Sequence, residues 1–323
     1  MLMETSKIPL EPIYIVGAGA IGCALAAFLV NAGKHGVLIR RSTEEQIPST
    51  KEIIVALPDG TELSAEVEVR IFEDLQTIDG IVVITTKSHA NEQVAAKLAL
   101  KGTHYPVILL QNGLNIEKPF LDQAFTQLYR CVLFVTSQFT ADHMIRFKPV
   151  APCRVGIIRG DVDLLESAVA QIDTPGFSFK AEAEIQTLIW KKVIVNCVFN
   201  SICPLLNTHN GIFWRNEAAL VIARRVIREC TAIARLRGIQ VSEDEVTETL
   251  LAISKSSDGQ LISTLQDINN SRPTEIDTLN MEISRIAASL GADSLVTETR
   301  LLGELTAIKS SLSLKPFDKV QKD

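Results

Sequence analysis

The sequence lacks several features that would assign it to a familiar class. It has no stretch of about 18 uninterrupted apolar residues, and no positively charged leader followed by an apolar run opens it. None of its six cysteines forms a CxxC pair, and no Cys/His cluster has zinc spacing. We therefore expect a cytoplasmic protein without a membrane span or a metal site, whose thiols are reduced core residues. The net charge of −6 and the lack of a dominant basic patch argue against nucleic acid or an anionic membrane as partner.

The length of 323 residues and the hydrophobic content of 46% favour two domains, each with its own core. Short apolar runs without alternation, which suit strands covered on both faces, alternate with helical stretches in the first half. Pro58-Asp59-Gly60 between two further runs indicates a hairpin. This order predicts right-handed crossovers and a parallel sheet in an α/β domain. We expect strands at 13–16, 37–39, 81–85 and 107–110, and hairpin arms at 53–57 and 62–69. Helices are expected at 20–31, between the 81–85 strand and residue 100, and after residue 115.

Strand signals end near residue 183, and long helical periods follow, separated by Gly238, Gly259 and Gly291. We therefore place an α/β domain at residues 1–182 and an all-α domain at 183–323. The helical domain could pair with a copy of itself as a homodimer, but no apolar stripe in the sequence singles out an interface. The expected helices are 183–206, 217–237, 243–254, 275–290 and 297–312.

A glycine motif, GxGxxG, directly follows the first expected strand and opens a helix. Its first glycine permits a tight turn, the second lets backbone approach a pyrophosphate, and the third lets the helix pack on the strand. The helix N-terminus offers free N–H groups and a partial positive charge to phosphate. The motif, a candidate dinucleotide site, comprises Gly17, Ala18, Gly19, Ala20, Ile21 and Gly22.

The end of the second strand discriminates between cofactors. NAD-binding chains tend to carry Asp or Glu there, but this chain carries Arg40-Arg41, which suits the 2′-phosphate of NADP; Arg41 is the better candidate. Lys87 and Asn112 follow two further strands, where ligands bind in open α/β sheets. Turn chemistry is the alternative for each, since Asn-Gly is a common turn pair.

An apolar segment, WKKVIVNCVFNSICPLL at 190–206, carries Lys192, Asn196 and Asn200 at positions i, i+4 and i+8. On a helix these three side chains lie in one narrow stripe. Burying a cation and two amides without partners is costly, so they serve either a buried network or a polar cleft.

These residues resemble the ketopantoate reductase (2-dehydropantoate 2-reductase) family over nearly the whole chain. The likeness rests on six blocks in order, namely GAGAIG at 17–22, TTKSHANE at 85–92, LLQNGL at 109–114, KVIVNCVFN at 192–200, Asn210-Gly211, and STLQD to RPTEID at 263–277. The resemblance implies a Rossmann-type domain, an all-helical C-terminal domain, and NADPH-dependent reduction of 2-dehydropantoate, a small 2-keto acid, to pantoate in pantothenate and coenzyme A biosynthesis.

The resemblance also implies roles for single residues. The lysine matching Lys192 is the general acid. The residues matching Asn196, Asn200, Asn210 and Ser263 hold substrate. The glutamate matching Glu275 closes the site against the substrate hydroxyl or cofactor, and the residues matching Lys87 and Asn112 contact NADPH. From the residues alone, Glu275 would complement a helix dipole from a first turn, whereas an ammonium near the ketone could quench a developing alkoxide.

The chain departs from the family pattern at Met281, Leu295 and Ser201, where glycine, proline and proline are usual. These changes concern pocket shape, so a reductase of another branched 2-keto acid stays open. Two further alternatives are a β-hydroxyacid-type dehydrogenase, although AEAEIQTLIW rather than a glycine-rich run precedes Lys192, and a non-catalytic NADP(H) sensor.

Overall fold

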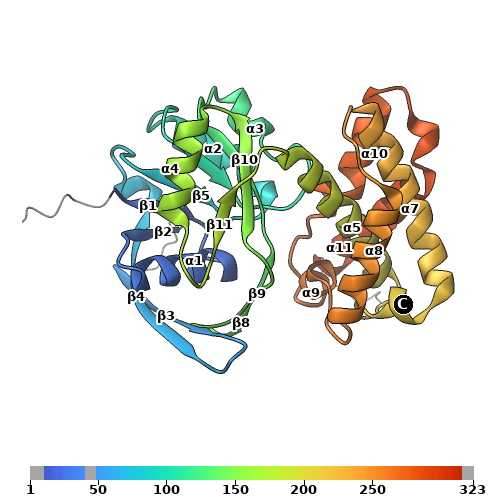
Figure 1. The fold of residues 1–323 in the computed structure, drawn as a ribbon, viewed down its shortest axis with the longest axis horizontal. Coiled ribbons are helices and arrows are strands. Elements are labelled where there is room, and N and C mark those ends of the chain that lie inside the picture. Colours follow the sequence, from blue (N-terminus) through green and yellow to red (C-terminus); the bar gives the residue numbers. More distant parts are fainter. Residues whose placement is uncertain (1–10, 41–48, 315–323) are drawn as a thin grey trace, which may run out of the picture. The chain divides into compact units, whose positions relative to one another are not determined.

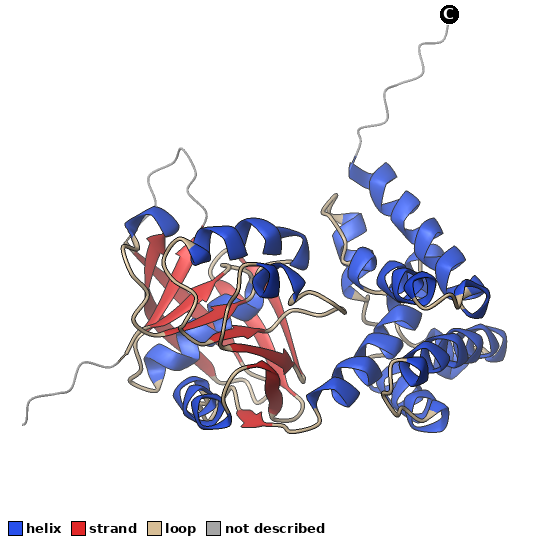
Figure 2. Cartoon of the chain, turned by 90° about the horizontal axis from the view of Figure 1, so that it is seen from above, coloured by secondary structure: helices blue, strands red, loops and turns tan. Residues whose placement is uncertain are grey.

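The computed structural model describes residues 11–40 and 49–314 (Figure 1). The chain divides into two compact units. The first comprises the described residues up to Gln111 together with Glu117–Ile185, and the second comprises Asn112–Ile116 and the described residues from Gln186 on. The first unit is α/β and the second is helical, which confirms the expected fold class (Figure 2).

The α/β unit is built on one mixed sheet. Among the described residues it has eleven strands, in the order β11-β10-β7-β6-β5-β1-β2-β4-β3-β9-β8. The strands are β1 (Ile13–Val16), β2 (Gly36–Arg40), β3 (Thr50–Ala56), β4 (Glu62–Ile71), β5 (Ile81–Ile84), β6 (Val107–Leu109), β7 (Leu128–Val132), β8 (Val135–Ala141), β9 (Met144–Pro149), β10 (Cys153–Arg159) and β11 (Phe179–Ala181).

The centre of the sheet is parallel, as expected. β1 pairs with β2 on one side and with β5 on the other, and β5, β6 and β7 continue in parallel. The order of strands therefore reverses at β1, which is the point where α/β sheets bind ligands beyond the carboxyl ends of their strands. The residues that follow β1 and β5 are the first place to look for a nucleotide site.

The antiparallel additions at both edges of the sheet were not predicted. The hairpin of β3 and β4 around Pro58-Asp59-Gly60 is confirmed, but the β8–β9 hairpin and the antiparallel pairing of β10 with β7 carry no clear sequence signal. β8 is largely exposed and has polar residues at most positions. Its alternation is too weak to mark it as a strand in advance.

Helices cover both faces of this sheet (Figure 2). They are α1 (Ala20–Asn31), α2 (Asn91–Ala99), α3 (Lys118–Asp122) and α4 (Val162–Ile172), with single 3₁₀ turns at Phe72–Asp74 and Ser88–Ala90. α1 is buried along nearly its whole length because β4, β3 and β8 also pack against it. An aromatic cluster beside it closes the core, formed by Phe28, Phe147, Phe177 and Phe179.

The helical unit is formed around α5, with no strand among its described residues. Its helices are α5 (Ile185–Leu205), α6 (Ile212–Arg215), α7 (Glu217–Leu236), α8 (Glu243–Ser256), α9 (Ser263–Asn269), α10 (Asn280–Ser289) and α11 (Thr297–Leu314), with 3₁₀ turns η3 (Ile276–Thr278) and η4 (Asp293–Leu295). α7 and α8 begin at side-chain caps from Asn216 and Ser242. The seven-residue α9 was not predicted, and the expected helix at 275–290 is shorter because Leu279 interrupts it.

α5 is the core helix of this unit. It is the one described helix long and apolar enough to cross a membrane by length and composition, but 72% of its most apolar window is buried inside the protein. Phe199 on α5 packs edge-on against Phe213 on α6. All six cysteines are buried, as expected for core thiols.

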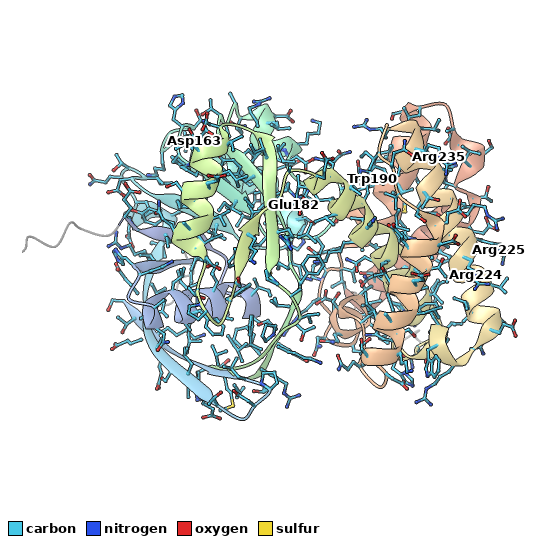
Figure 3. All side chains as sticks on the ribbon, viewed as in Figure 1. Asp163, Glu182, Trp190, Arg224, Arg225 and Arg235 are labelled. Carbon is cyan, nitrogen blue, oxygen red and sulfur yellow. The ribbon has the colours of Figure 1, made fainter. Side chains whose placement is uncertain are left out.

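The arginines of α7 lie at the surface. Figure 3 labels Arg224, Arg225 and Arg235, and all three are exposed. Arg225 pairs with Glu298 at 3.3 Å, and Arg228 lies 3.8 Å from Glu243. Neighbouring carboxylates therefore partly neutralise the positive charge of the α7 arginines.

Candidate functional site

The glycine turn after β1 has the backbone geometry that its sequence predicts. Gly17 has φ of +120°, and a Cβ there would lie 2.7 Å from the Thr86 nitrogen. At Gly22 a Cβ would overlap the Gly17 carbonyl oxygen. These two glycines are therefore required by the packing of the turn itself.

Gly19 differs from the other two glycines. It precedes the first turn of α1 in an extended conformation, and nothing lies within 4 Å of the position that its Cβ would occupy. Packing within the protein therefore does not require glycine at this position. An open backbone at a helix N-terminus is what a bound pyrophosphate needs, because its oxygens accept bonds from free N–H groups.

Thr85, directly after β5, supports this turn. Its Oγ1 donates to the carbonyl oxygens of Gly17 at 2.8 Å and Val16 at 3.2 Å. The hydroxyl of Thr85 therefore stabilises the glycine turn. The sequence showed this threonine only as a polar residue at a strand end. Lys87 lies two residues further on, half-buried, immediately before the 3₁₀ turn Ser88–Ala90.

A buried amide pair, which sequence reasoning missed, joins the start of α2 to the residues that follow β6. Gln111 and Asn91 exchange side-chain hydrogen bonds of 2.6 and 3.0 Å, and Gln111 Nε2 also donates to the Thr86 carbonyl oxygen at 2.8 Å. Both side chains are almost fully buried. The pair therefore fixes the loop that carries Lys87. Arg41, the other predicted cofactor contact, lies outside the described residues.

In the helical unit, α5 carries the predicted polar stripe. Lys192 and Asn196 are half-buried, whereas Asn200 is buried. Within the described residues the side chain of Asn196 forms no hydrogen bond, while Lys192 has partners of its own. The stripe therefore passes from a partly accessible end at Lys192 to a sealed end at Asn200.

Asn200 holds the start of α9. Its Oδ1 accepts from Thr264 Oγ1 at 2.8 Å, and from the Thr264 backbone nitrogen and Ser263 Oγ at 3.3 Å each. Two predicted substrate residues, Asn200 and Ser263, are thus brought together directly. Thr264, which was not predicted, carries the shortest of these contacts.

Asn210 lies against the end of α8. Its Nδ2 donates to Ser257 Oγ at 3.2 Å, and its backbone carbonyl accepts from Ser254 Oγ at 2.7 Å. Its Oδ1 is buried and has no hydrogen-bond partner among the described residues. The next residue, Gly211, leaves room for Asp258, which accepts from Arg215 Nε at 2.8 Å.

Glu275 does not occupy the first turn of an α-helix, so the helix-dipole reading is wrong. It precedes the short 3₁₀ turn η3, and α10 begins only at Asn280 because Leu279 adopts φ −109° and ψ −108°. The Glu275 carbonyl oxygen accepts from both the nitrogen and Oγ1 of Thr278, each at 3.1 Å.

The segment Asn112–Ile116 follows β6 in the chain but packs with the helices of the second unit. Leu114 donates its backbone N–H to the Thr278 carbonyl oxygen at 2.9 Å, and Asn115 Nδ2 donates to Glu282 at 2.6 Å. Gly113 abuts Thr278 so closely that a Cβ would clash. Thr278 therefore links the loop of Asn112 to the turn of Glu275.

The three departures from the family pattern have separate surroundings. Ser201 is buried and donates to the Cys197 carbonyl oxygen at 2.6 Å. Met281 is half-buried, and its sulfur would lie 3.1 Å from a Cβ at Gly303 on α11. Leu295 ends η4 and is exposed.

Two family models match this chain in succession. Residues 13–159 match the model described as ketopantoate reductase PanE/ApbA, and residues 184–305 match the one described as its C-terminal domain. The chain belongs to the ketopantoate reductase family. This confirms the resemblance stated on the sequence motifs.

Similar proteins agree with this membership. A Pyrococcus abyssi protein named 2-dehydropantoate 2-reductase is 25% identical over 87% of this chain and 93% of its own length. A ketopantoate reductase family structure from Ralstonia eutropha has a TM-score of 0.82 at 23% identity, covering 94% of this chain and 100% of its own.

Two further solved structures share the fold. A D-mandelate dehydrogenase solved with NADH and anilino(oxo)acetate has a TM-score of 0.81 at 21% identity, and a dimeric ketopantoate reductase from Staphylococcus aureus has 0.77 at 21%. Each covers 94% of this chain and 99% of its own.

Proposed function

We propose that this chain is a cytoplasmic NADPH-dependent reductase that converts 2-dehydropantoate to pantoate, a step toward pantothenate and coenzyme A, and that it works as a homodimer. Family membership over both matched regions supports the reaction class. The observation that carries the proposal is the stripe of Lys192, Asn196 and Asn200 on one face of α5, with Ser263 held against Asn200.

The residues of the glycine turn fit a dinucleotide. Gly17 and Gly22 shape the turn, and the open Cβ position at Gly19 leaves the α1 N-terminus accessible to a pyrophosphate. Arg41 would hold the 2′-phosphate that distinguishes NADPH from NADH, and Lys87, Asn112 and Glu275 would make further cofactor contacts. NADPH, when bound, supplies the hydride. The similar mandelate dehydrogenase, solved with NADH and anilino(oxo)acetate, supports a nicotinamide dinucleotide as the kind of cofactor, and the choice of NADPH rests on Arg41.

Lys192 is proposed as the general acid. A hydride added to a ketone carbon leaves negative charge on its oxygen, and an ammonium group can stabilise that charge and donate the proton. The half-buried Asn196, together with Asn200, Asn210 and Ser263, would orient the keto acid without adding charge. The buried Oδ1 of Asn210, which lacks a partner among the described residues, is an acceptor for a substrate hydroxyl. Glu275 would close the site against that hydroxyl.

An NADPH-consumption assay with 2-dehydropantoate, run beside NADH, tests the proposal. Turnover with a preference for NADPH is expected, and Lys192→Ala should lower kcat by about 10²–10⁴-fold. Lys191→Ala is the matched control, because Lys191 is adjacent on α5 but pairs with Glu245 on α8. If Lys192→Ala turned over as fast as wild type, the acid assignment would be wrong. Tight NADPH binding without turnover on any keto acid would indicate a sensor instead.

A second candidate is a reductase of a different branched 2-keto acid. Met281 favours it, because this bulky side chain stands where the family usually has glycine, packed toward Gly303. Comparing kcat/KM across a panel of keto acids separates the two candidates. A preference of two orders of magnitude or more for another acid would replace 2-dehydropantoate as the substrate.

A further inference from the structure

Asn210 is held by the end of α8 and by the connector between α8 and α9 (residues 257–262). Its backbone carbonyl accepts from Ser254 Oγ at 2.7 Å, and its backbone N–H donates to the Gln260 carbonyl oxygen at 2.9 Å. Its side-chain Nδ2 donates to Ser257 Oγ at 3.2 Å. Because the backbone is fixed on both sides, the remaining variable at Asn210 is the direction in which its amide group points.

The hydroxyl of Ser257 determines that direction. Its Oγ lies 2.6 Å from the carbonyl oxygen of Ile253, four residues earlier, and two oxygens come this close when a proton lies between them. A carbonyl oxygen cannot donate, so the Ser257 hydroxyl gives its one proton to Ile253 and can only accept from Asn210. The Asn210 atom that faces Ser257 is therefore the N–H donor Nδ2 and not the oxygen.

Ser254 cannot reverse this arrangement. It is fully buried, its hydroxyl proton goes to the Asn210 carbonyl oxygen, and its Oγ accepts the Trp214 backbone N–H at 3.1 Å. Ser254 thus has no second proton for the Asn210 side chain. The two serines have separate tasks, since Ser254 fixes the backbone of Asn210 and Ser257 fixes its amide.

The consequence appears at the other end of the Asn210 amide. Its Oδ1 is buried and has no hydrogen-bond partner among the described residues. The connector that binds the Asn210 backbone leads directly to Ser263, whose Oγ donates to Asn200 at 3.3 Å. A buried acceptor that lacks a donor, in a segment joined to two other proposed substrate contacts, is suited to a donor carried by the substrate.

We propose that Ser257 is a positioning residue that sets the hydrogen-bond polarity of the substrate site. By binding Nδ2, it turns Asn210 into an acceptor, so the site favours a 2-keto acid that presents a hydroxyl donor. An acid with a carbonyl or carboxylate at that place would set oxygen against oxygen. Ser257 acts through Asn210 and does not itself touch the substrate. This inference rests on the proposed function, because it takes Asn210 as a substrate contact.

Steady-state kinetics with two matched acids test the polarity. The acids are 2-dehydropantoate and its analogue with hydrogen in place of the hydroxyl, and wild type should favour the first by roughly 100-fold or more in kcat/KM. Ser257→Ala frees the amide to turn, so the preference should fall by about tenfold or more, chiefly through a higher KM for 2-dehydropantoate. Ser257→Thr keeps a hydroxyl that can bond the carbonyl four residues earlier, and it should restore the preference.

Ser256→Ala is the matched control for these kinetics. Ser256 Oγ also lies within reach of the Ile253 carbonyl oxygen, at 3.2 Å, but Ser256 is exposed at the last position of α8. This variant should keep the wild-type preference between the two acids. An unchanged preference in Ser257→Ala, or an equal loss in Ser256→Ala, would overturn the proposal.

Urea unfolding without substrate separates this inference from the reductase assignment. Ser257→Ala should lower the urea midpoint more in the wild-type background than in Asn210→Ala, where the amide contact is already gone. Equal shifts in the two backgrounds, with normal turnover, would overturn the positioning role and leave the reductase assignment intact. If wild type reduced neither acid and the shifts differed, the reductase assignment would fail, and the orientation of Asn210 by Ser257 would stand.

Discussion

The side-chain oxygen of Asn200 on α5 accepts a hydrogen bond from Thr264 Oγ1 on α9 at 2.8 Å. Both residues are buried, and the same oxygen also accepts from Ser263 and from the Thr264 backbone. Asn200 is therefore a packing residue of the helical unit as well as a proposed substrate contact. Asn196, four residues earlier, has no such bond within the described residues.

Asn200→Ala should destabilise the protein by about 1–3 kcal/mol, because it leaves the buried Thr264 donors without an acceptor. Asn196→Ala should change stability by less than about 0.5 kcal/mol, since its side chain is half-buried and anchors nothing. Its effect should instead be a higher KM for the keto acid. Urea denaturation and steady-state kinetics on both variants measure this contrast. Equal losses of stability in the two variants would contradict it.

Gly19→Ala should leave the melting temperature unchanged, because no protein atom lies within 4 Å of the added carbon. It should weaken NADPH binding by about tenfold or more, since the methyl group occupies the approach of the pyrophosphate. Gly22→Ala is the comparison, and it should lose stability because its Cβ overlaps the Gly17 carbonyl. Calorimetric titration and thermal melts separate the two effects. Unaltered NADPH affinity in Gly19→Ala would place the pyrophosphate elsewhere.

Arg41→Ala should raise KM for NADPH about tenfold or more and leave KM for NADH nearly unchanged. The reason is that the guanidinium is proposed to pair only with the 2′-phosphate, which NADH lacks. Arg40→Ala tests whether the neighbouring arginine shares this role. A parallel rise in KM for both cofactors would mean that Arg41 does not read the 2′-phosphate.

Asp258→Asn should show a pH-dependent loss of stability. The hydrogen bond from Arg215 lowers the pKa of the Asp258 carboxyl below its ordinary value of 3.8. The folded state thus binds its proton less readily than the unfolded state. The stabilisation is present above the unfolded pKa of about 3.9 and is lost as pH falls through the folded pKa.

Urea midpoints of wild type and Asp258→Asn between pH 7 and pH 3 measure this effect. The difference between the two urea midpoints should be constant above about pH 5 and should decrease below about pH 4. Arg215→Gln should show the same trend. A gap that is as wide at pH 3 as at pH 7 would show that the carboxylate charge is not the cause.

The parts of the fold that were predictable have strong local signals. β1, α1 and the β3–β4 hairpin follow from an unbroken apolar run, an alanine-rich stretch and Pro58-Asp59-Gly60. The strands β7 to β11 were not assigned, because their pairing depends on long-range contacts that a sequence window does not contain. α9 is too short for a helical period to be recognised, and the break at Leu279 depends on local packing.

The site was predictable in its composition and less so in its contacts. Spacing alone placed Lys192, Asn196 and Asn200 on one face of α5. The sequence could not show that Asn200 caps α9 through Thr264, or that Thr278 joins the Gly113 loop to the Glu275 turn. Those links join residues far apart in the chain, and a hydroxyl at a turn gives no sign of its partner.

The loop Asn112–Ile116 lies within the sequence of the first unit but packs as part of the second. The chain passes from one unit to the other after Gln111, after Ile116 and after Ile185. After cleavage near residue 185, the non-covalent contacts of Asn112–Ile116 within the second unit would therefore still hold the two pieces together. A separately expressed fragment beginning at Gln186 would lack Leu114 and Asn115, and so would lose the backbone hydrogen bond to Thr278 and the side-chain hydrogen bond to Glu282. Fragment complementation should therefore favour a split inside an exposed loop of one unit over a split at the apparent domain border.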